Sequence, residues 1–492
     1  MLAQVNKSQK LNFKMLYSTQ DAFAIDDFKT KQLTTLNKSQ ELNNYYKSKL
    51  SVNKLLNRSL ISFQANKSEP FYRWFKYKEG FSTNFVKYIL KLFGEPYQNQ
   101  VVLDPFSGIG TSLSTSCENG FDAVGIELLP HAVLAINARI ASKRISKDRI
   151  INLIDQLKRV DFLDASVESQ FFFKHIAITR GAFPKETEIS IANFRKFLFE
   201  HCSSEDIKSL LSLIAISILE DVSFTRKDGQ YLRWDYRSDR NLKSKFNKGI
   251  IYPFKDRLFE KLENIKEDIG NTSEPKCPEF NLISGSCLYK LQDLKSESVN
   301  LVITSPPYCN RYDYTRTYAL ELAFTGVDDK KIKELRQTLL SATVENKSKY
   351  ADLKSLYIRK GKLEQFERIV EVHKNHPVLS EIITNLNNCR DILNNKNIPG
   401  MINNYFFEMN FVINELARTL KTKGKIIMVN DNVQYNGNEI PVDLILSDFA
   451  REAGLTTEVI WVLEKGKGNS SQQMGIHGRN EIRKCVYVWS KS

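Results

Sequence analysis

The chain has 492 residues, of which 71 are Lys or Arg and 57 are Asp or Glu, so its formal net charge at pH 7 is +14. This balance favours an anionic partner such as nucleic acid. The seven cysteines are scattered without a Cys-x-x-Cys pair, which argues against a zinc site and for a reducing compartment. No apolar run reaches transmembrane length and the N-terminus has no signal-peptide core. We therefore expect a cytoplasmic protein with no membrane partner and no bound metal.

The first elements in the chain are polar and then aromatic. Residues 1–65 are rich in Lys, Asn, Gln and Ser, and this composition predicts a helical or partly disordered arm. Residues 71–85 read FYRWFKYKEGFSTNF and directly precede an apolar run. By composition alone, this segment is the start of an amphipathic helix that packs on a sheet.

A strand, a glycine-rich turn and a helix follow over residues 101–119. The turn at 104–111 reads DPFSGIGT, and its two glycines allow the backbone to approach a ligand closely. The next strand, 123–126, ends in Glu127, an acid that suits the two hydroxyls of a ribose. Position 113 is Leu, so the third glycine of a dinucleotide fingerprint is missing. A nicotinamide enzyme is therefore disfavoured, while a generic α/β turn stays open.

Residues 144–278 do not continue this alternation of strands and helices, which predicts an insertion. An apolar helical pattern covers 206–219, and residues 224–249 then become basic and aromatic. Cations can meet phosphates there and aromatic rings can stack on bases, which makes the insertion a candidate DNA-recognition region. The alternative is a charged surface loop with buried aromatic rings. The candidate DNA contacts in this segment are Arg226, Arg233, Trp234 and Arg237.

The core resumes with a strand at 280–283 and another at 299–303, which is followed by Thr-Ser-Pro-Pro-Tyr at 304–308. Two consecutive prolines fix φ and remove two N–H donors, so the loop is stiff. Such a loop can hold an exocyclic amine with two acceptors while a ring stacks on the base; taken alone, it could equally be a proline-rich turn. Three residues just after it should lie near the pocket: Arg311, Tyr312 and Arg316.

The remaining elements complete an α/β sheet. Residues 327–394 are charged and predict a second, helical insertion, and 466–480 form a turn-rich linker. Helices are expected at 405–420 and 442–453, and strands at 425–429, 456–463 and 484–489. The predicted fold is a doubly wound, seven-stranded, Rossmann-like sheet with a final antiparallel hairpin and helical insertions. Its core would comprise 66–143, 279–326 and 395–492.

The TSPPY loop together with the DPFSGIGT turn resembles the S-adenosylmethionine-dependent DNA amino-methyltransferases, and the SPPY form resembles their cytosine-N4 type. The segment at 71–85 is similar to motif X of that family, which gives the motif order X, I, IV over a little under half of the chain. The resemblance implies S-adenosylmethionine as cofactor. It assigns the cofactor to Phe81, Ser82, Thr83, Asp104, Pro105, Phe106, Gly108, Gly110, Thr111, Glu127, Ser286 and Cys287. At Ser286 the family carries an acid that accepts from adenine; a serine accepts more weakly, so a backbone group near Cys287 would serve instead.

The same resemblance implies a catalytic set of Ser305, Pro306, Pro307 and Tyr308. The serine hydroxyl and the Pro306 carbonyl would each accept one amine hydrogen, and the tyrosine would stack on a flipped-out base. Cytosine C5 methylation is disfavoured because it needs a Pro-Cys pair, whereas the chain has only the reverse order, Cys277-Pro278. Cys309 is expected to line the pocket.

The serine of SPPY favours cytosine N4, and adenine N6 is the alternative. Two other classes stay open: an RNA or protein amine methyltransferase, and a catalytically decayed nucleic-acid-binding protein. The expected partner is double-stranded DNA. By analogy, the enzyme would be the protective half of a restriction–modification system, whose cognate endonuclease it need not contact.

Overall fold

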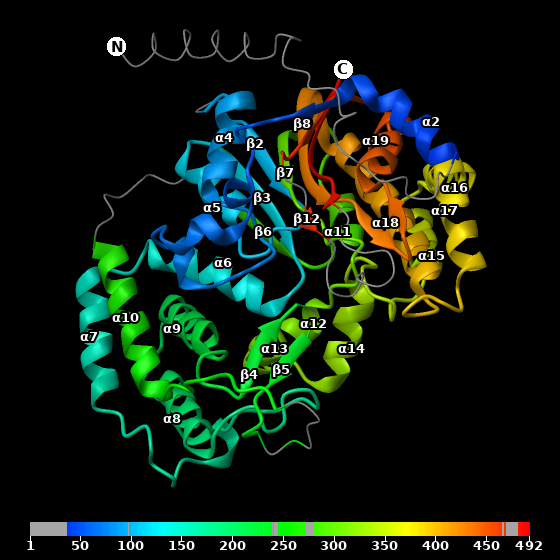
Figure 1. The fold of residues 1–492 in the computed structure, drawn as a ribbon. Coiled ribbons are helices and arrows are strands. Elements are labelled where there is room, and N and C mark those ends of the chain that lie inside the picture. The colour runs from blue at the N-terminus through cyan, green and yellow to red at the C-terminus, as the bar shows by residue number, and fades with distance from the viewer. Residues whose placement is uncertain are drawn as a thin grey trace.

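The structure is a computed structural model. It describes residues 37–96, 98–229, 231–238, 240, 245–270, 280–464, 467–468 and 481–492. Most of the predicted linker at 466–480, the first part of the predicted arm and Cys277 lie outside the described residues. One eight-stranded sheet forms the centre of the molecule, with the strand order β1-β11-β14-β8-β7-β2-β3-β6 (Figure 1).

Five neighbouring strands of this sheet are parallel. They are β6 (Phe280–Ser284), β3 (Asp122–Glu127), β2 (Val101–Asp104), β7 (Val299–Thr304) and β8 (Leu420–Asp431). Strand β7, which leads into TSPPY, lies inside the set, between β2 and β8. Apart from Asn300, residues 299–303 of this strand are apolar, because helices cover both faces of the sheet.

The period-two alternation of strand residues separates two cores. Val102 and Ile303 belong to one core with helix α4 (Thr83–Phe93). Leu103 and Val302, the neighbours of those two residues in sequence, belong to the other core with α18 (Ile398–Thr419) and α19 (Val442–Glu452). The sheet is thus covered on both sides, as a doubly wound fold requires.

The sheet ends in an antiparallel arrangement. Strand β14 (Lys484–Lys491) runs antiparallel to both β8 and β11 (Leu455–Val462). The predicted fold class, a Rossmann-like α/β sheet with a closing antiparallel hairpin, is therefore confirmed. The sheet also has an eighth strand: β1 (Leu50–Val52) pairs with the edge of β11. This segment was predicted as part of the polar arm, since three residues are too few to show a periodicity.

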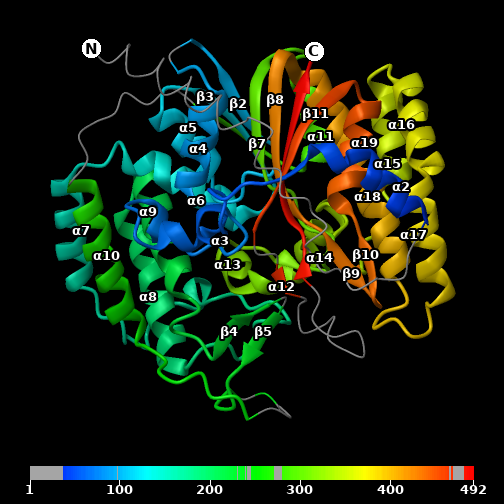
Figure 2. The same cartoon turned by 45° about the horizontal axis from the view of Figure 1, so that its top comes forward.

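The first insertion forms a lobe (Figure 2), whose core also includes residues from outside the insertion, among them Trp74, Ala135 and Leu335. Its helices are α7 (Lys147–Lys158), α8 (Lys185–His201), α9 (Glu205–Ile218) and α10 (Phe254–Gly270), and its hairpin is β4 (Thr225–Asp228) with β5 (Tyr231–Trp234). The apolar pattern predicted for 206–219 is buried in α9. Helix α6 (Pro130–Ser142) packs against α9 and joins the lobe to the sheet.

Most of the second insertion lies on the opposite side of the sheet from the first, whereas its first helix lies beside the first lobe. It contains α14 (Asp329–Thr338), α15 (Tyr350–Arg359), α16 (Leu363–Asn375) and α17 (Pro377–Asn388). Helices α15, α16 and α17 share a core with α18, whereas Ile332 and Leu335 of α14 belong to the core of the first lobe. The other elements are α2 (Asn37–Tyr46), α3 (Arg58–Ile61), α5 (Thr111–Glu118), α11 (Cys287–Lys290), α12 (Tyr314–Thr317), α13 (Ala319–Phe324), β9 (Val433–Tyr435), β10 (Asn438–Ile440), β12 (Lys467–Gly468) and β13 (Glu481–Ile482). Among the described residues, no helix is long and apolar enough to cross a membrane.

Candidate active site

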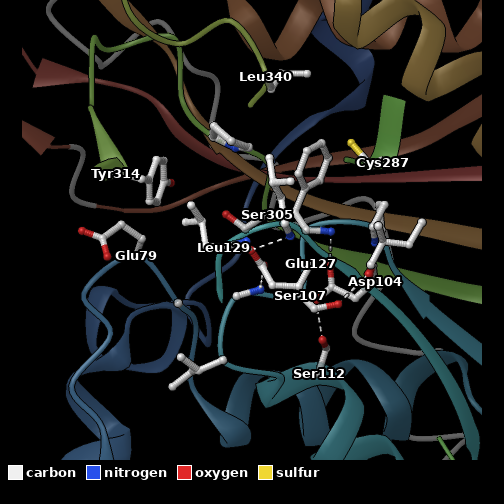
Figure 3. A pocket seen from close by; sticks show the side chains of 18 of the residues that line it. Glu79, Asp104, Ser107, Ser112, Glu127, Leu129, Cys287, Ser305, Tyr314 and Leu340 are labelled. Carbon is white, nitrogen blue, oxygen red and sulfur yellow. Dashed lines mark hydrogen bonds between the residues drawn. The ribbon is translucent and has the colours of Figure 1, made fainter. Parts of the chain in front are cut away.

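A pocket opens at the carboxyl ends of β2, β3, β6 and β7, where an open α/β sheet usually binds its ligand (Figure 3). Most of the residues that the sequence assigned to the cofactor line it. They are Phe81, Asp104, Pro105, Phe106, Gly108, Thr111, Glu127, Ser286 and Cys287. Two of the four predicted catalytic residues, Ser305 and Pro307, line the same pocket. The tertiary structure therefore brings the X-, I- and IV-like segments to one place.

The glycine turn has two left-handed residues with different neighbours. Gly108 has φ 52° and lines the pocket, and a Cβ on it would lie 3.0 Å from the Tyr77 ring. Gly110 has φ 74°, and its Cβ would lie 2.8 Å from Ile136 of helix α6. Only glycine adopts both conformations without strain. Gly108 therefore shapes the pocket, whereas Gly110 allows α5 and α6 to pack closely and is not a lining residue.

Asp104 is buried at the end of β2 and links the glycine turn to the start of the TSPPY loop. Its Oδ1 accepts from the Phe106 N–H at 3.0 Å and from the Thr304 hydroxyl at 2.7 Å. Its Oδ2 accepts from the Ser112 hydroxyl. Burial raises the pKa of Asp104 to about 6, against the opposing effect of these hydrogen bonds. The carboxylate thus fixes β2, α5 and β7 relative to one another.

Glu127 holds the glycine turn from the next strand. Its Oε2 accepts from the Gly108 N–H at 2.7 Å, and its Oε1 accepts from the Leu128 and Leu129 N–H groups at 2.9 and 2.8 Å. Burial raises the pKa of Glu127 to about 7. A carboxylate offers about four acceptor positions, so these bonds leave one for a ligand hydroxyl.

The residues of the motif X-like segment that line the pocket lie a few positions earlier in the sequence than expected. Ser82 is fully buried; its hydroxyl accepts from Phe85 N–H at the start of α4 and donates to the Leu60 carbonyl. Thr83 is also buried and donates its N–H to Asn66. Neither residue lines the pocket, because the helix cap turns both inward. Tyr77 and Glu79 line it instead, beside Phe81.

The residues of the TSPPY loop, which the sequence predicts to be catalytic, point in two directions. Ser305 lines the pocket, and its hydroxyl lies 3.4 Å from the Tyr308 hydroxyl. Tyr308 and Pro306 are outside the lining set, and the Tyr308 ring lies on the β14 side, 5.9 Å from Lys484 Nζ. Cys309 was expected to line the pocket but is fully buried in the core, where its carbonyl accepts from the Tyr435 hydroxyl at 2.8 Å. Burial raises the pKa of its thiol, so it is not a ready nucleophile.

Comparisons with known proteins give the family. The chain is 42% identical over 473 residues to a protein of Nostoc sp. (strain PCC 7120) named type II methyltransferase M.AvaI, and the match covers 94% of each chain. It is 40% identical over 457 residues to type II methyltransferase M.BsoBI of Geobacillus stearothermophilus, with 88% of each chain covered. The chain belongs to the type II methyltransferases. No protein-family model matches it.

Type II methyltransferases modify DNA at specific sites in restriction–modification systems, and their methyl donor is S-adenosylmethionine. The pocket of this methyltransferase fits that donor. Thr111 Oγ1 is buried on the pocket wall and has no hydrogen-bond partner among the described residues, so it is available to a polar ligand. Glu127 keeps an acceptor position, and Glu79 adds a second carboxylate to a wall that would face a cationic cofactor.

The basic residues in and just after the β4–β5 hairpin of the methyltransferase have different surroundings. Arg226 and Arg233 are cross-strand partners and both are exposed. Arg237, also predicted to contact DNA, forms a paired contact with Asp235 at 2.7 and 2.9 Å and donates to the Gly249 carbonyl. Arg237 thus stabilises the loop after the hairpin, because its charge is already neutralised by a buried carboxylate.

Trp234 was predicted to contact DNA through its ring. The ring is half-buried, and the Arg240 guanidinium lies over it, 3.8 Å from the ring centroid. Arg240 also donates to the carbonyls of Ala177 and Arg180, which keeps it in place. The tryptophan therefore has an intramolecular partner on one face.

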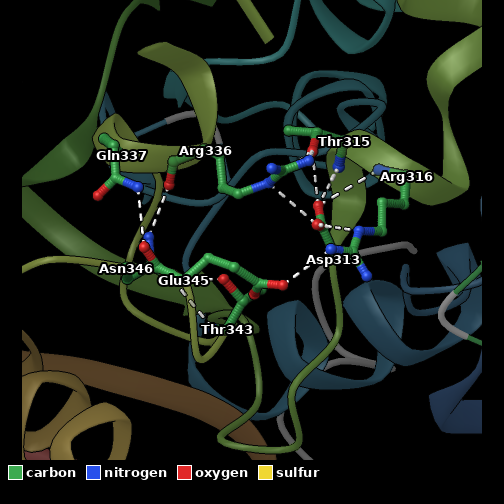
Figure 4. A network of polar contacts seen from close by, with 8 residues as sticks. All are labelled: Asp313, Thr315, Arg316, Arg336, Gln337, Thr343, Glu345 and Asn346. Carbon is green, nitrogen blue, oxygen red and sulfur yellow. Dashed lines mark hydrogen bonds and ion pairs between the residues drawn. The ribbon is translucent and has the colours of Figure 1, made fainter. Parts of the chain in front are cut away.

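The three predicted DNA contacts that follow the TSPPY loop have different surroundings. Arg311 has a left-handed φ of 67°, and the Tyr312 ring packs edge-on against Tyr314, which lines the pocket. Arg316 is paired with Asp313 at 3.2 Å and with Glu345 at 2.8 Å (Figure 4). The Asp313 carboxylate also pairs with Arg336 at 3.0 Å. Arg316 thus belongs to a network that joins residues 313–316 to the first part of the second insertion.

Sequence reasoning missed several lining residues. Tyr77 and Glu79 lie inside the aromatic segment that was singled out, and their spacing from Phe81 could have indicated them. Leu339 and Leu340 also line the pocket but come from the second insertion. No local pattern marks them, since they lie in a loop after α14 whose position depends on Glu408 of α18 accepting from Ser341.

Proposed function

We propose that this DNA methyltransferase transfers the methyl group of S-adenosylmethionine to the exocyclic N4 amine of a flipped cytosine in double-stranded DNA. One observation carries the proposal: Ser305 lies on the wall of the cofactor pocket, next to a Thr304 that is bonded to Asp104 of the glycine turn. The buried Asp104 carboxylate thereby holds both the glycine turn and the residue that precedes the proposed amine acceptor, Ser305.

The chemistry needs positioning more than it needs a nucleophile from the protein. The cytosine amine is a poor nucleophile because its lone pair is delocalised into the ring. The Ser305 hydroxyl and the Pro306 carbonyl would each accept one amine hydrogen, which localises that lone pair and stabilises the positive charge developing on nitrogen. The cofactor supplies an electrophilic methyl group on its sulfonium. The amine proton then leaves to water.

Residues of the glycine turn and the neighbouring strands would hold the cofactor. The turn backbone at Gly108 would approach it closely, and Glu127 would accept from a ribose hydroxyl. Thr111 would donate to or accept from its amino-acid end, and the Ser286–Cys287 segment would contact the adenine. Phe81 and Phe106 would supply apolar walls.

A base in a duplex cannot reach this pocket, so the target must be flipped out. Tyr308 would stack on the flipped base. The preference for cytosine over adenine rests on the serine at the first position of SPPY, as in the cytosine-N4 type of the family. The exposed Arg226 and Arg233 would contact phosphates, with Arg311 and Tyr312 nearer the flipped nucleotide.

The biological setting follows from the substrate. We propose that the enzyme acts on cellular DNA in the cytoplasm and protects the site cut by a cognate endonuclease. The endonuclease would read the same site without contacting this protein.

Sequencing that distinguishes modified bases, applied to DNA from cells expressing the wild-type chain, tests the proposal. Nucleoside mass spectrometry of the same DNA should detect N4-methylcytosine at one sequence motif. Cells expressing Ser305→Ala provide the matched control and should lack the modification. N6-methyladenine at the motif would overturn the choice of base, and unmodified DNA beside methylated RNA or protein would overturn the choice of substrate.

A further inference from the structure

The inner face of the β4–β5 hairpin carries a buried lysine. Lys227 follows Arg226 in the strand and therefore points to the opposite face. It is 8% exposed, and its Nζ lies 2.5 Å from Glu321 Oε1 of helix α13, which is 1% exposed. Apolar residues of similar size would fill such a site without the cost of removing two charges from water. We therefore expect the Lys227–Glu321 pair to have a role other than stabilising the fold.

Lys227 also contacts an aromatic cluster next to the pocket. Its Nζ lies 4.3 Å from the centroid of the Tyr318 ring, a cation–π distance. The fully buried Tyr318 ring stacks on Tyr77 with 5.2 Å between centroids. The Tyr318 hydroxyl donates to Glu79 Oε2 at 2.5 Å. The lysine thus touches the ring that positions two residues of the pocket wall.

A second contact joins the same two segments. Lys78, between Tyr77 and Glu79 in sequence, donates from Nζ to the Lys227 carbonyl at 2.9 Å. Tyr77 itself is the residue that a side chain on Gly108 would meet. Residues 77–79 are therefore held to the hairpin on one side and lie against the glycine turn on the other.

We propose that Lys227 is a positioning residue that couples DNA binding on the hairpin to cofactor binding in the pocket. The proposal rests on the proposed function in one respect, namely that DNA engages the outward-facing Arg226 and Arg233. DNA that fixes the hairpin also fixes Lys227, because the two side chains leave adjacent residues of one strand. Lys227 then holds Tyr318, and through it Tyr77 and Glu79, in the position that receives the cofactor. Each ligand strengthens the binding of the other by the same factor.

Calorimetry with S-adenosylhomocysteine, the unreactive product, measures this coupling. The titration is done on the full-length protein with and without a duplex that carries the site mapped by sequencing. For the wild type, the duplex should tighten the binding of S-adenosylhomocysteine about 10-fold, which is within the usual range of coupling between sites. Lys227→Met/Glu321→Gln removes both charges together. It should reduce the coupling to below about 2-fold, while each ligand alone binds within about 3-fold of the wild type.

Further variants test whether the loss of coupling is specific to Lys227. Lys208→Met/Glu205→Gln removes an exposed Lys–Glu pair of the same insertion, at 3.0 Å on α9, and should keep the wild-type coupling. Lys227→Arg retains the charge and should restore most of the coupling. If the double variant does not fold, Lys78→Met removes only the contact with the Lys227 carbonyl and should still lower the coupling.

The proposal is overturned if the wild type shows no coupling, or if a folded Lys227→Met/Glu321→Gln protein couples as the wild type does. The role of the hairpin in DNA binding is tested separately. If Arg226→Glu/Arg233→Glu binds DNA with an unchanged salt dependence, DNA does not engage this hairpin, whatever the coupling measured at Lys227.

Discussion

The hydroxyl of Thr304 donates to Asp104 Oδ1 at 2.7 Å across 200 residues of sequence. These two residues end the neighbouring parallel strands β7 and β2. One precedes the proposed amine acceptor and the other begins the glycine turn. In the proposed reaction, this bond would set the distance between the cofactor and the target base, which is what a positioning mechanism requires.

Replacement of Thr304 by Val should keep the shape of the strand end and remove this bond. Asp104 would lose one of its donors while staying buried, which should cost about 1–3 kcal/mol of folding stability. Turnover and cofactor affinity should both fall, as measured by methyl transfer and by calorimetry. A variant that changes only one of them would contradict a role for Thr304 in joining the two sites.

Ser305→Ala should act on turnover alone. The serine lines the pocket but is not bonded to the glycine turn, so cofactor binding should stay near the wild-type value. Loss of one transition-state acceptor should lower the single-turnover rate about 100-fold. Unchanged turnover in the folded variant would remove the amine-acceptor role.

Cofactor affinity should fall as the pH drops below about 7, where Glu127 gains a proton. The protonated carboxyl is a weaker acceptor for the Gly108 N–H and for a ribose hydroxyl. Because the folded-state pKa is higher than the ordinary value of 4.5, this group stabilises the fold most at low pH, and its contribution is lost as pH rises through 7. Weaker binding at pH 6 should therefore not come from local unfolding at Glu127. Titrations between pH 6 and 8 check the slope, and Glu127→Gln should flatten it.

The two turn glycines should respond differently to alanine. Gly108→Ala places a Cβ 3.0 Å from the Tyr77 ring at the pocket wall, and it should lose most cofactor binding. Gly110→Ala places its Cβ 2.8 Å from Ile136 inside the packing of α5 on α6, and it should lower thermal stability by about 1–3 kcal/mol. Calorimetry and thermal unfolding of both variants separate the two effects. Equal losses of binding and stability in both would contradict the distinction.

Charge reversal at Arg226 and Arg233 should weaken DNA binding and reduce the slope of log affinity against log salt by about 1–2. Lys147→Glu/Lys158→Glu makes the same change in net charge on α7, where both lysines are exposed, and serves as the control. Arg237→Glu should instead destabilise the loop, because Asp235 would lose its partner. Fluorescence anisotropy at several salt concentrations measures the slopes; equal slopes for the wild type and the Arg226 and Arg233 variant would place DNA elsewhere.

The sequence by itself determined the local units of this protein. The strand–turn–helix at 101–119, the acid after the next strand and the TSPPY loop each depend on residues adjacent in the chain, so their patterns are legible without the fold. Ser82 and Thr83, which the sequence assigned to the cofactor, lie next to the lining residue Phe81, and the helix cap at Ser82 turns both side chains inward.

Tertiary structure decided everything that depends on residues far apart in the chain. It brought Leu339 and Leu340 of the second insertion to the cofactor pocket, and it added β1 to the sheet edge. It also separated Arg226 from Lys227, neighbours in one basic run, into an exposed and a buried residue. The physical reason is that burial and partner choice are set by what packs against a side chain, and Glu321 and Tyr318 reach Lys227 only when the chain has folded.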